Sequence, residues 1–427
     1  MITGNVRILV LVVMLYAHRA HAMAFSVQST GHNKIPFVLG LMSDKPELRD
    51  IAQIIKKDFE YRSQFAVDIK QLSCRLGKHD IKQLYKDGYH LALFINYVDE
   101  ATVEWRLYST HQSTMVKGKK YIKRGPELRA WAHNISDAVW PVVTNTPGFF
   151  STKIAYCKEV PLSTGHHYKH IYVADYDGSN AQPLVTSSTI SVAPRWNRDG
   201  EYPIVFYSEC TTSNIRLMAT DMKKRRKIVS NFDGLNMLPA FSRDGTKVVY
   251  CASRGDGCCQ LYYYEKGVFR RLTHNNGNNI SPVFSENADK VFFCSDFQTG
   301  MPQIFCYDLV TDVFERLTDS GYCASPAYCA SKQMLAYTKI VKGVSQIFLY
   351  NLVSKEHKQV TFDASNKEEC SWSVCGTYLA HSVQEGISNR IALYDLITNE
   401  RRFITPASER CSYPAWSPIY TDFPLVT

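Results

Sequence analysis

Short apolar segments separated by turn residues recur along the C-terminal two thirds of the chain. Each segment is four to six residues long, which predicts β-strands and excludes a helical repeat. In one unit, an aromatic stretch ends at the Asp244-Gly245 turn, and apolar strands are expected over 247–251, 260–264 and 269–273. Four strands within about 44 residues are typical of one blade of a β-propeller.

A motif of Pro, any residue and an aromatic residue recurs through this region. Its first positions, called anchors below, are 45, 43, 44, 44 and 44 residues apart, and they are Pro194, Pro239, Pro282, Pro326, Cys370 and Pro414. Only one strand is expected after the last anchor, so its three partners are expected upstream, over 150–186. The sequence therefore predicts an all-β six-bladed propeller of WD40-like or PD40 repeats over 146–427. The C-terminal strand would close the ring by joining residues 150–186, with Trp416 beside Ile154.

Residues 34–145 lack this repeat and have a mixed pattern. A strand is expected over 35–41 and a helix over 45–59, because apolar residues recur there at helical spacing. Three further strands and a closing helix are expected over 91–95, 103–108, 113–116 and 126–139. Residues 34–145 are therefore predicted to form a small α/β domain.

The first 33 residues have the pattern of an export signal. Arg7 precedes an apolar run over 8–17 that is too short to cross a bilayer comfortably, and Ala20-His21-Ala22 has the small residues of a cleavage site. We expect a cleaved signal peptide over 1–22 and a flexible mature tail over 23–33. An uncleaved membrane anchor is the alternative.

The composition is that of a folded globular protein, with 427 residues, 45% hydrophobic and 21% charged. It argues against intrinsic disorder and against a polytopic membrane protein. The formal net charge of +9 is modest and does not by itself indicate nucleic-acid binding. The one dense basic run, Lys223–Lys227, is either a solvated hairpin tip or a contact for an anionic partner or lipid headgroup.

Patterns of catalysis or metal binding are weak. The sequence has no Gly-x-Ser-x-Gly motif, and His166, His167 and His170 cluster in an expected surface loop without a carboxylate nearby in sequence. The 13 Cys are odd in number and have no zinc spacing. Cys323 and Cys411 are expected two blades apart, too far for a direct disulfide. We expect no cofactor and no metal.

Three segments carry a family resemblance: residues 35–40, the junction 129–137 and the stretch 147–156. Together they resemble the TolB family of the bacterial Tol-Pal envelope system. The resemblance implies a periplasmic, non-enzymatic scaffold that supports outer-membrane integrity and envelope constriction during cell division. It also implies two partners: the outer-membrane lipoprotein Pal at the propeller mouth and TolA at the mature N-terminal tail. The family's tail usually alternates apolar and acidic residues, whereas residues 23–33 contain no acid.

Residues just before each anchor are expected in loops that line the propeller mouth. The candidates for partner binding are Asn236, Met237, Leu238, Asn279, Ile280, Ser281, Ser325, Glu368, Glu369 and Tyr413. This mixture of apolar and polar side chains suits a protein interface better than a metal site. A periplasmic propeller enzyme, such as a metal- or quinone-dependent lactonase or dehydrogenase, remains the alternative, and it rests on the fold alone.

Overall fold

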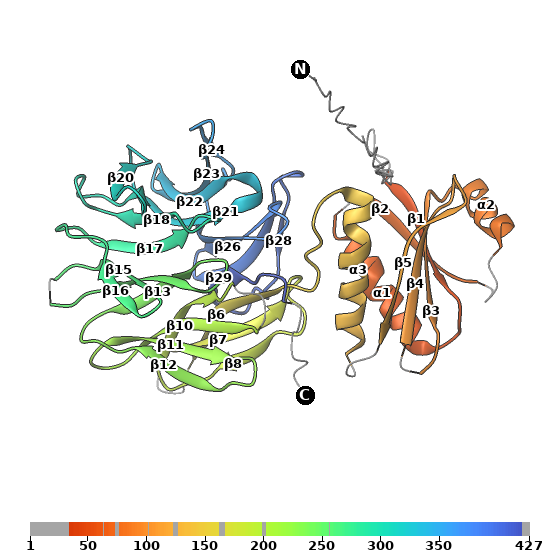
Figure 1. Ribbon diagram of the computed structural model, residues 1–427, viewed down its shortest axis with the longest axis horizontal. Helices are drawn as coiled ribbons and strands as arrows, with labels where there is room; N and C mark the ends of the chain where they lie inside the picture. The colour runs from red at the N-terminus through yellow and green to blue at the C-terminus, as the bar shows by residue number, and fades with distance from the viewer. Residues whose placement is uncertain are drawn as a thin grey trace, which may run out of the picture.

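The computed structural model describes residues 34–420, apart from 63, 73–76, 101, 123–126, 162–166, 199–201 and 256. The expected signal peptide over 1–22 and the tail over 23–33 lie outside these residues. The described chain forms two parts that lie side by side, an N-terminal α/β part and a larger part made of β-sheets (Figure 1). None of the described helices is both long and apolar enough to cross a bilayer.

The α/β part is built on a five-stranded sheet with the order β2-β1-β3-β4-β5. Its strands are β1 (Ile35–Leu41), β2 (Phe65–Gln71), β3 (Leu91–Tyr97), β4 (Thr102–Ser109) and β5 (Thr114–Ile122). Its helices are α1 (Pro46–Glu60), α2 (Lys78–Lys86) and α3 (Leu128–Thr144). The expected strands and both expected helices are present, β5 is longer than expected, and β2 and α2 were not anticipated.

Helices α1 and α3 cover one face of this sheet because each has an apolar face. In α1, Leu48, Ile51, Ile55 and Phe59 recur at helical spacing, and all four are fully buried. They pack with the inward side chains of β1, β3 and β4, including Trp105. The shorter helix α2 belongs to a smaller cluster, with Ile81 and Leu84 as its buried residues.

The larger part, the propeller part, consists of antiparallel sheets. Four sheets have four strands each. These are β13 (Asn236–Phe241), β14 (Lys247–Ala252), β15 (Gln260–Glu265) and β16 (Val268–Arg271); β17 (Asn279–Phe284), β18 (Lys290–Ser295), β19 (Gln303–Asp308) and β20 (Val313–Arg316); β21 (Cys323–Cys329), β22 (Met334–Val341), β23 (Val344–Asn351) and β24 (His357–Gln359); and β25 (Asn366–Trp372), β26 (Tyr378–Glu385), β27 (Ser388–Asp395) and β28 (Arg401–Phe403). The three strands expected after Asp244-Gly245 correspond to β14, β15 and β16.

A fifth sheet of this part has eight strands. They are β6 (Lys153–Pro161), β7 (His167–Asp175), β8 (Gln182–Val185), β9 (Ile190–Trp196), β10 (Ile204–Cys210), β11 (Ile215–Asp221), β12 (Arg226–Ser230) and β29 (Cys411–Trp416). A single residue pair, Lys169 with Ile190, joins β7 to β9. The sheet therefore consists of two four-stranded groups, β9 to β12 and β29 with β6, β7 and β8.

Strand β29 pairs with β6 although about 250 residues of chain separate them. The expected pairing of Trp416 with Ile154 is present. Ser417 and Lys153 exchange two hydrogen bonds: the Ser417 amide donates to the Lys153 carbonyl (2.8 Å), and the Lys153 amide donates to Ser417 Oγ (2.9 Å). Ser285 and Lys290, which are joined by a short turn, make the same two bonds at 3.0 Å. Strand β29 thus occupies the position of a covalently connected first strand.

A second repeated contact explains the Thr found near the end of four of the units. The hydroxyl oxygens of Thr273, Thr318, Thr361 and Thr405 each accept a hydrogen bond from a third-strand amide, at 2.9 Å in all four cases. The donors are the amides of Leu261, Ile304, Ile347 and Ile391. Each bond satisfies a buried donor where the fourth strand ends, which explains why the residue type recurs with the repeat.

A buried polar cluster joins the two parts of the protein. Asp58 in α1 accepts hydrogen bonds from Ser136 Oγ (2.6 Å) and from the Tyr176 hydroxyl (2.8 Å), and it lies 2.9 Å from His133 Nδ1. Arg129 in α3 adds a bidentate contact to Asp177, at 2.8 and 2.9 Å. Because Tyr176 and Asp177 belong to the propeller part, these bonds fix the α/β part against it.

Candidate protein-binding site

The strand directions define two faces of the propeller part. In an antiparallel four-stranded sheet, the first and third strands start at the same end, where the second and fourth strands finish. We call this end the mouth face. It carries the loops that lead into first strands, such as 319–322 and 362–365, and those between second and third strands, such as 386–387.

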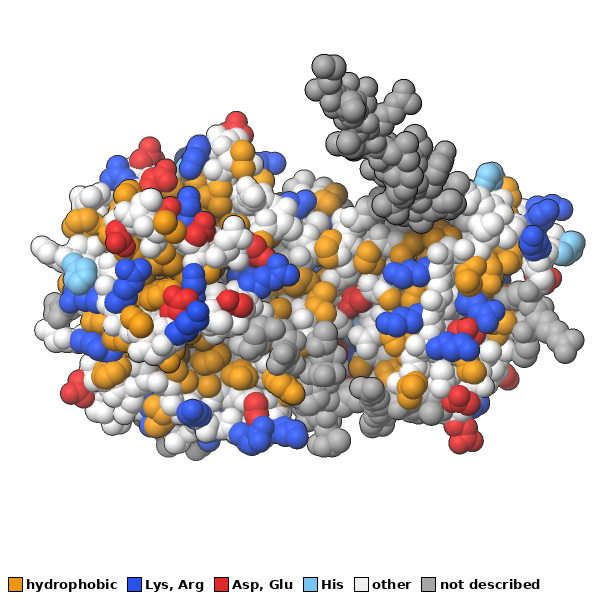
Figure 2. Space-filling model, viewed as in Figure 1, with side chains coloured by type: hydrophobic (Ala, Val, Ile, Leu, Met, Phe, Trp, Pro, Cys, Tyr) orange, Lys and Arg blue, Asp and Glu red, His pale blue; other side chains and the backbone are white. Residues whose placement is uncertain are grey.

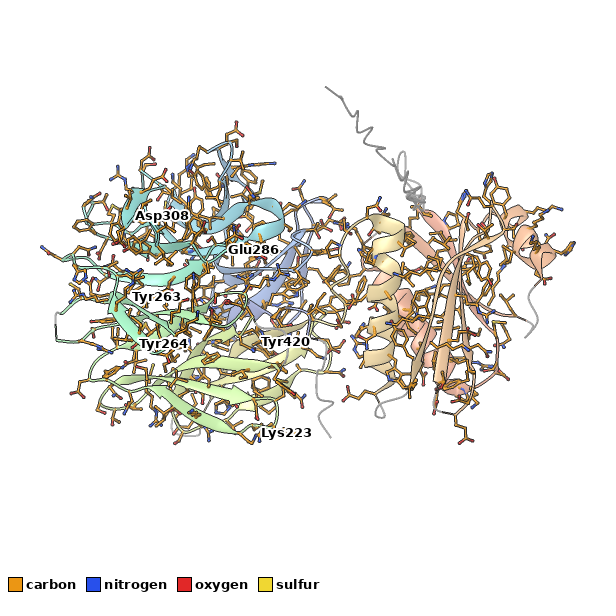
Figure 3. The ribbon with its side chains drawn as sticks, in the orientation of Figure 1. Lys223, Tyr263, Tyr264, Glu286, Asp308 and Tyr420 are labelled. Atoms are coloured by element: carbon orange, nitrogen blue, oxygen red, sulfur yellow. The ribbon has the colours of Figure 1, made fainter. Side chains whose placement is uncertain are left out.

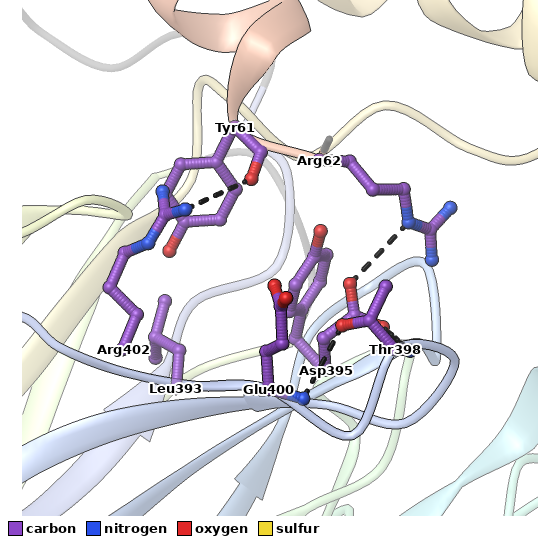
Figure 4. Close-up of a pocket in the computed structure, with 8 residues that line it drawn as sticks. Tyr61, Arg62, Leu393, Asp395, Thr398, Glu400 and Arg402 are labelled. Carbon is purple, nitrogen blue, oxygen red and sulfur yellow. Dashed lines mark hydrogen bonds and ion pairs between the residues drawn. The ribbon is translucent and has the colours of Figure 1, made fainter. Parts of the chain in front are cut away.

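The α/β part lies at the opposite end, called here the domain face. Arg62 contacts Asp395 at the end of β27, with 3.5 Å between Arg62 Nε and Asp395 Oδ2. Between the two parts lies a cavity of about 20 Å³, bordered by Tyr61, Arg62, Tyr378 and Arg402 among others (Figure 4). A space of this size holds one or two waters and is too small for a ligand. This cavity is therefore not a ligand site. A larger space of about 420 Å³ lies between the sheets β17 to β20 and β21 to β24, bordered by Glu286, Lys290 and Tyr328 among others.

The ten predicted contact residues do not lie in loops. They belong to the first strands β13, β17, β21, β25 and β29. The expectation that they form connecting loops was wrong because each first strand begins three to four residues before its anchor. Their positions at the start of these strands still bring them to the mouth face.

Asn236 and Asn279 are fully buried, which corrects their assignment as contact residues. The Asn236 side chain donates to the carbonyls of Ile215 (3.0 Å) and Phe232 (2.6 Å). Asn279 Nδ2 donates to several acceptors in the preceding loop, including the Gly277 carbonyl at 2.9 Å. Their amide groups hold the incoming loops in place, so they cannot offer hydrogen bonds to a partner.

The residue before each anchor has a left-handed backbone conformation. These residues are Ala193, Leu238, Ser281, Ser325, Glu369 and Tyr413, with φ of 53°, 52°, 54°, 53°, 62° and 56°. In all six of these strands the pairing register with the second strand shifts at the same place, which is the mark of a β-bulge. Four of the predicted contact residues, Leu238, Ser281, Ser325 and Tyr413, stand at these bulges and are partly exposed.

Two acidic side chains, Glu368 and Glu369, lie on the mouth face and differ in their accessibility. Glu369 also stands at a bulge, and its carboxylate accepts hydrogen bonds from Ser382 Oγ and the Tyr413 amide, both at 2.6 Å. Burial raises the pKa of Glu369 despite these bonds, which act in the opposite direction. The neighbouring Glu368 is exposed and accepts a hydrogen bond from Ser345 Oγ at 2.9 Å. Glu368 is therefore the more accessible carboxylate.

Met237 and Ile280 complete the predicted set. Both are partly buried and pack against the core formed by the sheets β13 to β16 and β17 to β20. They add apolar area beside the bulges. The structure therefore brings eight of the ten predicted residues to accessible or partly accessible positions on one face.

A rim of exposed apolar side chains surrounds these residues, and the sequence analysis missed it. Its members lie in loops of the mouth face or next to them, and they are Phe232, Phe297, Met301, Tyr322, Phe362 and Ile387. Phe362 is 75% exposed and Ile387 is 84% exposed. Large apolar residues within Gly-, Asp- and Asn-rich loops were the available signal, because such loops offer no core in which to bury them.

The described residues contain no group of three or more His, Cys, Asp or Glu arranged to hold a metal ion. Of the histidine cluster, His166 lies outside the described residues. The expectation of a surface loop was wrong for His167 and His170, which lie on strand β7; His170 Nε2 is 3.1 Å from the Ser187 carbonyl. Cys323 and Cys411 are both buried and both free in the structure.

Comparison with known proteins places the chain in a family. A family model described as the TolB beta propeller domain matches residues 140–420. A protein of Azoarcus sp. (strain BH72), called Tol-Pal system protein TolB, is 28% identical over 217 residues, 49% of each chain. A protein of Nitrosomonas europaea with the same name is 29% identical over 223 residues, 50% of this chain and 51% of that one. The chain thus spans about half the length of the curated relatives it matches.

A solved structure agrees with the fold. TolB from Acinetobacter baumannii superposes with a TM-score of 0.76 at 20% sequence identity, covering 90% of this chain and 97% of that chain. At this identity the likeness concerns the fold. Since the family model covers more than half of the residues, the chain belongs to the TolB β-propeller family.

Proposed function

We propose that this chain is a periplasmic, non-catalytic scaffold of a Tol-Pal system that binds a Pal-like outer-membrane lipoprotein at the mouth face. In this role it supports outer-membrane integrity and envelope constriction during cell division. Two things support the proposal: the family, and the names of its curated relatives as Tol-Pal system proteins. The observation that carries it is the rim of exposed apolar side chains around the bulges.

A closed ring of six blades is part of the proposal. The eight-stranded sheet counts as two blades, because one residue pair joins its two four-stranded groups. The bonds between Ser417 and Lys153 support closure, since they match those of a continuous blade. A closed ring makes the mouth face a rigid platform for a partner.

The chemistry of the mouth face suits a folded protein partner. Phe362 and Ile387 offer the large apolar contacts that dominate binding energy in protein interfaces. Tyr413 and Met237 lie inside the rim and add partly exposed area. Glu368 supplies an accessible charge that gives direction to docking. Exposed apolar patches on a folded protein mark interaction sites, and the rim supplies such apolar area on the mouth face.

The mouth face can be tested with two matched double variants. Phe362→Glu with Ile387→Glu removes two rim contacts, and Val310→Glu with Val353→Glu makes the same change at residues 80% and 73% exposed on the domain face. By isothermal titration against the Pal-like lipoprotein of the same organism, we expect the rim variant to bind at least about tenfold more weakly. The control should bind as the unchanged protein does. Equal effects of both variants, or no binding by the unchanged protein, would refute docking at the mouth face.

The mature tail has its own test. We propose that residues 23–33 contact a TolA-like protein after export, as the family resemblance implies. A chain that begins at residue 34 should then lose TolA capture in a pull-down and keep its affinity for the lipoprotein. Unchanged TolA capture would remove the tail from the proposal.

A further inference from the structure

The basic run Lys223–Lys227 covers the turn between β11 and β12 and the first two residues of β12, and it is called the tip below. Residues 223–229 are all exposed, and they comprise five basic residues followed by Ile228 and Val229. Lys223 lies at the lower edge of the propeller part in Figure 3, where lysine and arginine side chains gather in Figure 2. The hairpin therefore presents a compact positive tip with apolar residues beside it.

The hairpin is held firmly although its tip is exposed. Met222, just before the tip, is buried in the core of the eight-stranded sheet. Asp221 accepts hydrogen bonds from the Arg225 amide (2.9 Å) and from Arg225 Nε (2.5 Å). Lys224 has a left-handed conformation, with φ of 63°, and closes the turn. The basic side chains therefore project from a fixed backbone.

Among the residues that the structure describes, carboxylates neutralise only part of the positive charge at this tip. Among the described residues, the ion pair of Arg225 with Asp221 is the carboxylate contact recorded for these five side chains. The corresponding turn of the sheet β17 to β20 contains Asp308 and Asp312, and that of the sheet β25 to β28 contains Asp395 and Asn399. The basic tip is thus particular to this turn and is not a property of the repeat.

The chemistry of the tip favours a broad anionic surface over a peptide. Its exposed lysines are flexible point charges, which do not orient a single carboxylate as the planar fork of an arginine does. Lysines near an anionic bilayer gain from the summed charge of many headgroups, and exposed Ile228 and Val229 can enter the interface. We propose that the hairpin 221–229 binds the surface of an anionic phospholipid membrane.

The position of the hairpin fits the proposed function without depending on it. It joins the end of a third strand to the start of a fourth, so it lies on the domain face. A membrane bound there leaves the mouth face free. The protein could then hold a lipoprotein at one face and a membrane at the other.

The test uses vesicles and two variants of equal charge. Lys223→Gln, Lys224→Asn and Lys227→Gln together remove three charges from the tip, and Asn tolerates the left-handed position 224. The control Lys266→Asn, Lys342→Asn and Lys358→Gln removes three exposed charges elsewhere. Lys266 and Lys342 also have a left-handed conformation, with φ of 47° and 51°. Circular dichroism would show that both variants fold.

Co-sedimentation with phosphatidylglycerol-containing vesicles should capture the full chain, and pure phosphatidylcholine vesicles should not. We expect the tip variant to bind at least about tenfold more weakly, the control within about twofold of the unchanged chain, and binding to fall as salt rises. Equal loss in both variants, or no preference for anionic vesicles, overturns the proposal. So does tip-dependent binding to polyglutamate without vesicle binding, which would indicate an acidic protein. Lipoprotein affinity at the mouth face should be unchanged in the tip variant, so the two proposals can fail separately.

Discussion

Replacement of Trp416 by Ala tests how strongly this side chain stabilises the packing of strand β29 against the rest of the propeller part. The Trp416 side chain is buried among residues of both parts, and its Nε1 donates to Thr152 Oγ1 at 2.8 Å. Replacing a buried Trp by Ala costs about 3 to 5 kcal/mol of unfolding free energy. About 1 kcal/mol of this loss comes from the hydrogen bond to Thr152. Since domains are commonly stable by only about 5 to 15 kcal/mol, the loss should be large.

Trp372→Ala is the matched control for this experiment. Trp372 holds the equivalent place in β25, is also buried, and donates from Nε1 to the Ala327 carbonyl at 3.0 Å. Guanidinium denaturation should show a similar loss of unfolding free energy in both variants. Hydrogen exchange should separate them, because Trp416→Ala frees β29 and exposes the amides of its partner β6. A loss below about 1 kcal/mol in Trp416→Ala, or unchanged exchange in β6, would refute the reasoning.

Two further predictions concern titratable side chains. Burial lowers the pKa of His381 from 6.5 to about 4. As the pH falls, the unfolded chain therefore takes up a proton at His381 before the folded chain does. The free energy of unfolding should be highest above pH 6.5 and should fall by about 3 kcal/mol toward pH 4. His381→Leu should reduce this fall in denaturation curves, and an unchanged pH dependence would contradict it. Thiol titration of the native protein should detect the partly exposed Cys210 and Cys258 first, and denaturation without reductant should reveal at least twelve thiols. A smaller number would show that disulfides form.

The repeat was readable from the sequence because two contacts recur with it. The aromatic residue two places after each anchor packs between neighbouring sheets, as Trp196 does through its hydrogen bond to the Ala415 carbonyl. The turn after it is held by a side chain that caps the next strand, as in Ser285 with Lys290. Such contacts need particular residue types, so the same types recur at the same position of successive repeats.

Elements without a regular pattern of buried residues were either missed or predicted too short. Helix α2 is short and polar, with Ile81 and Leu84 as its buried residues, so it has little helical periodicity. Strand β5 is an edge strand with almost every residue exposed, and its length is set by pairing with β4 and not by a buried face. The strand predicted from the sequence, over 113–116, was therefore shorter than β5 in the structure.

The candidate site was only partly predictable. The anchors located the mouth face, but the bulges could not be predicted from the sequence. Left-handed positions are usually recognised by glycine, and none of the six residues here is glycine. Burial of Asn236 and Asn279 depends on loop carbonyls such as those of Phe232 and Gly277, which converge only in the folded chain. The rim residues follow from the three-dimensional position of the loops.

One backbone conformation at the bulges carries Ala, Leu, Ser, Glu or Tyr. The main chain fixes where each of these side chains starts, and their burial differs: Ser281 and Ser325 are partly exposed, whereas Ala193 is buried. In the role proposed above, substitution at a partly exposed bulge would change what the mouth face recognises and leave the pairing of the strands intact. Choice of partner and stability of the fold would then depend on different residues.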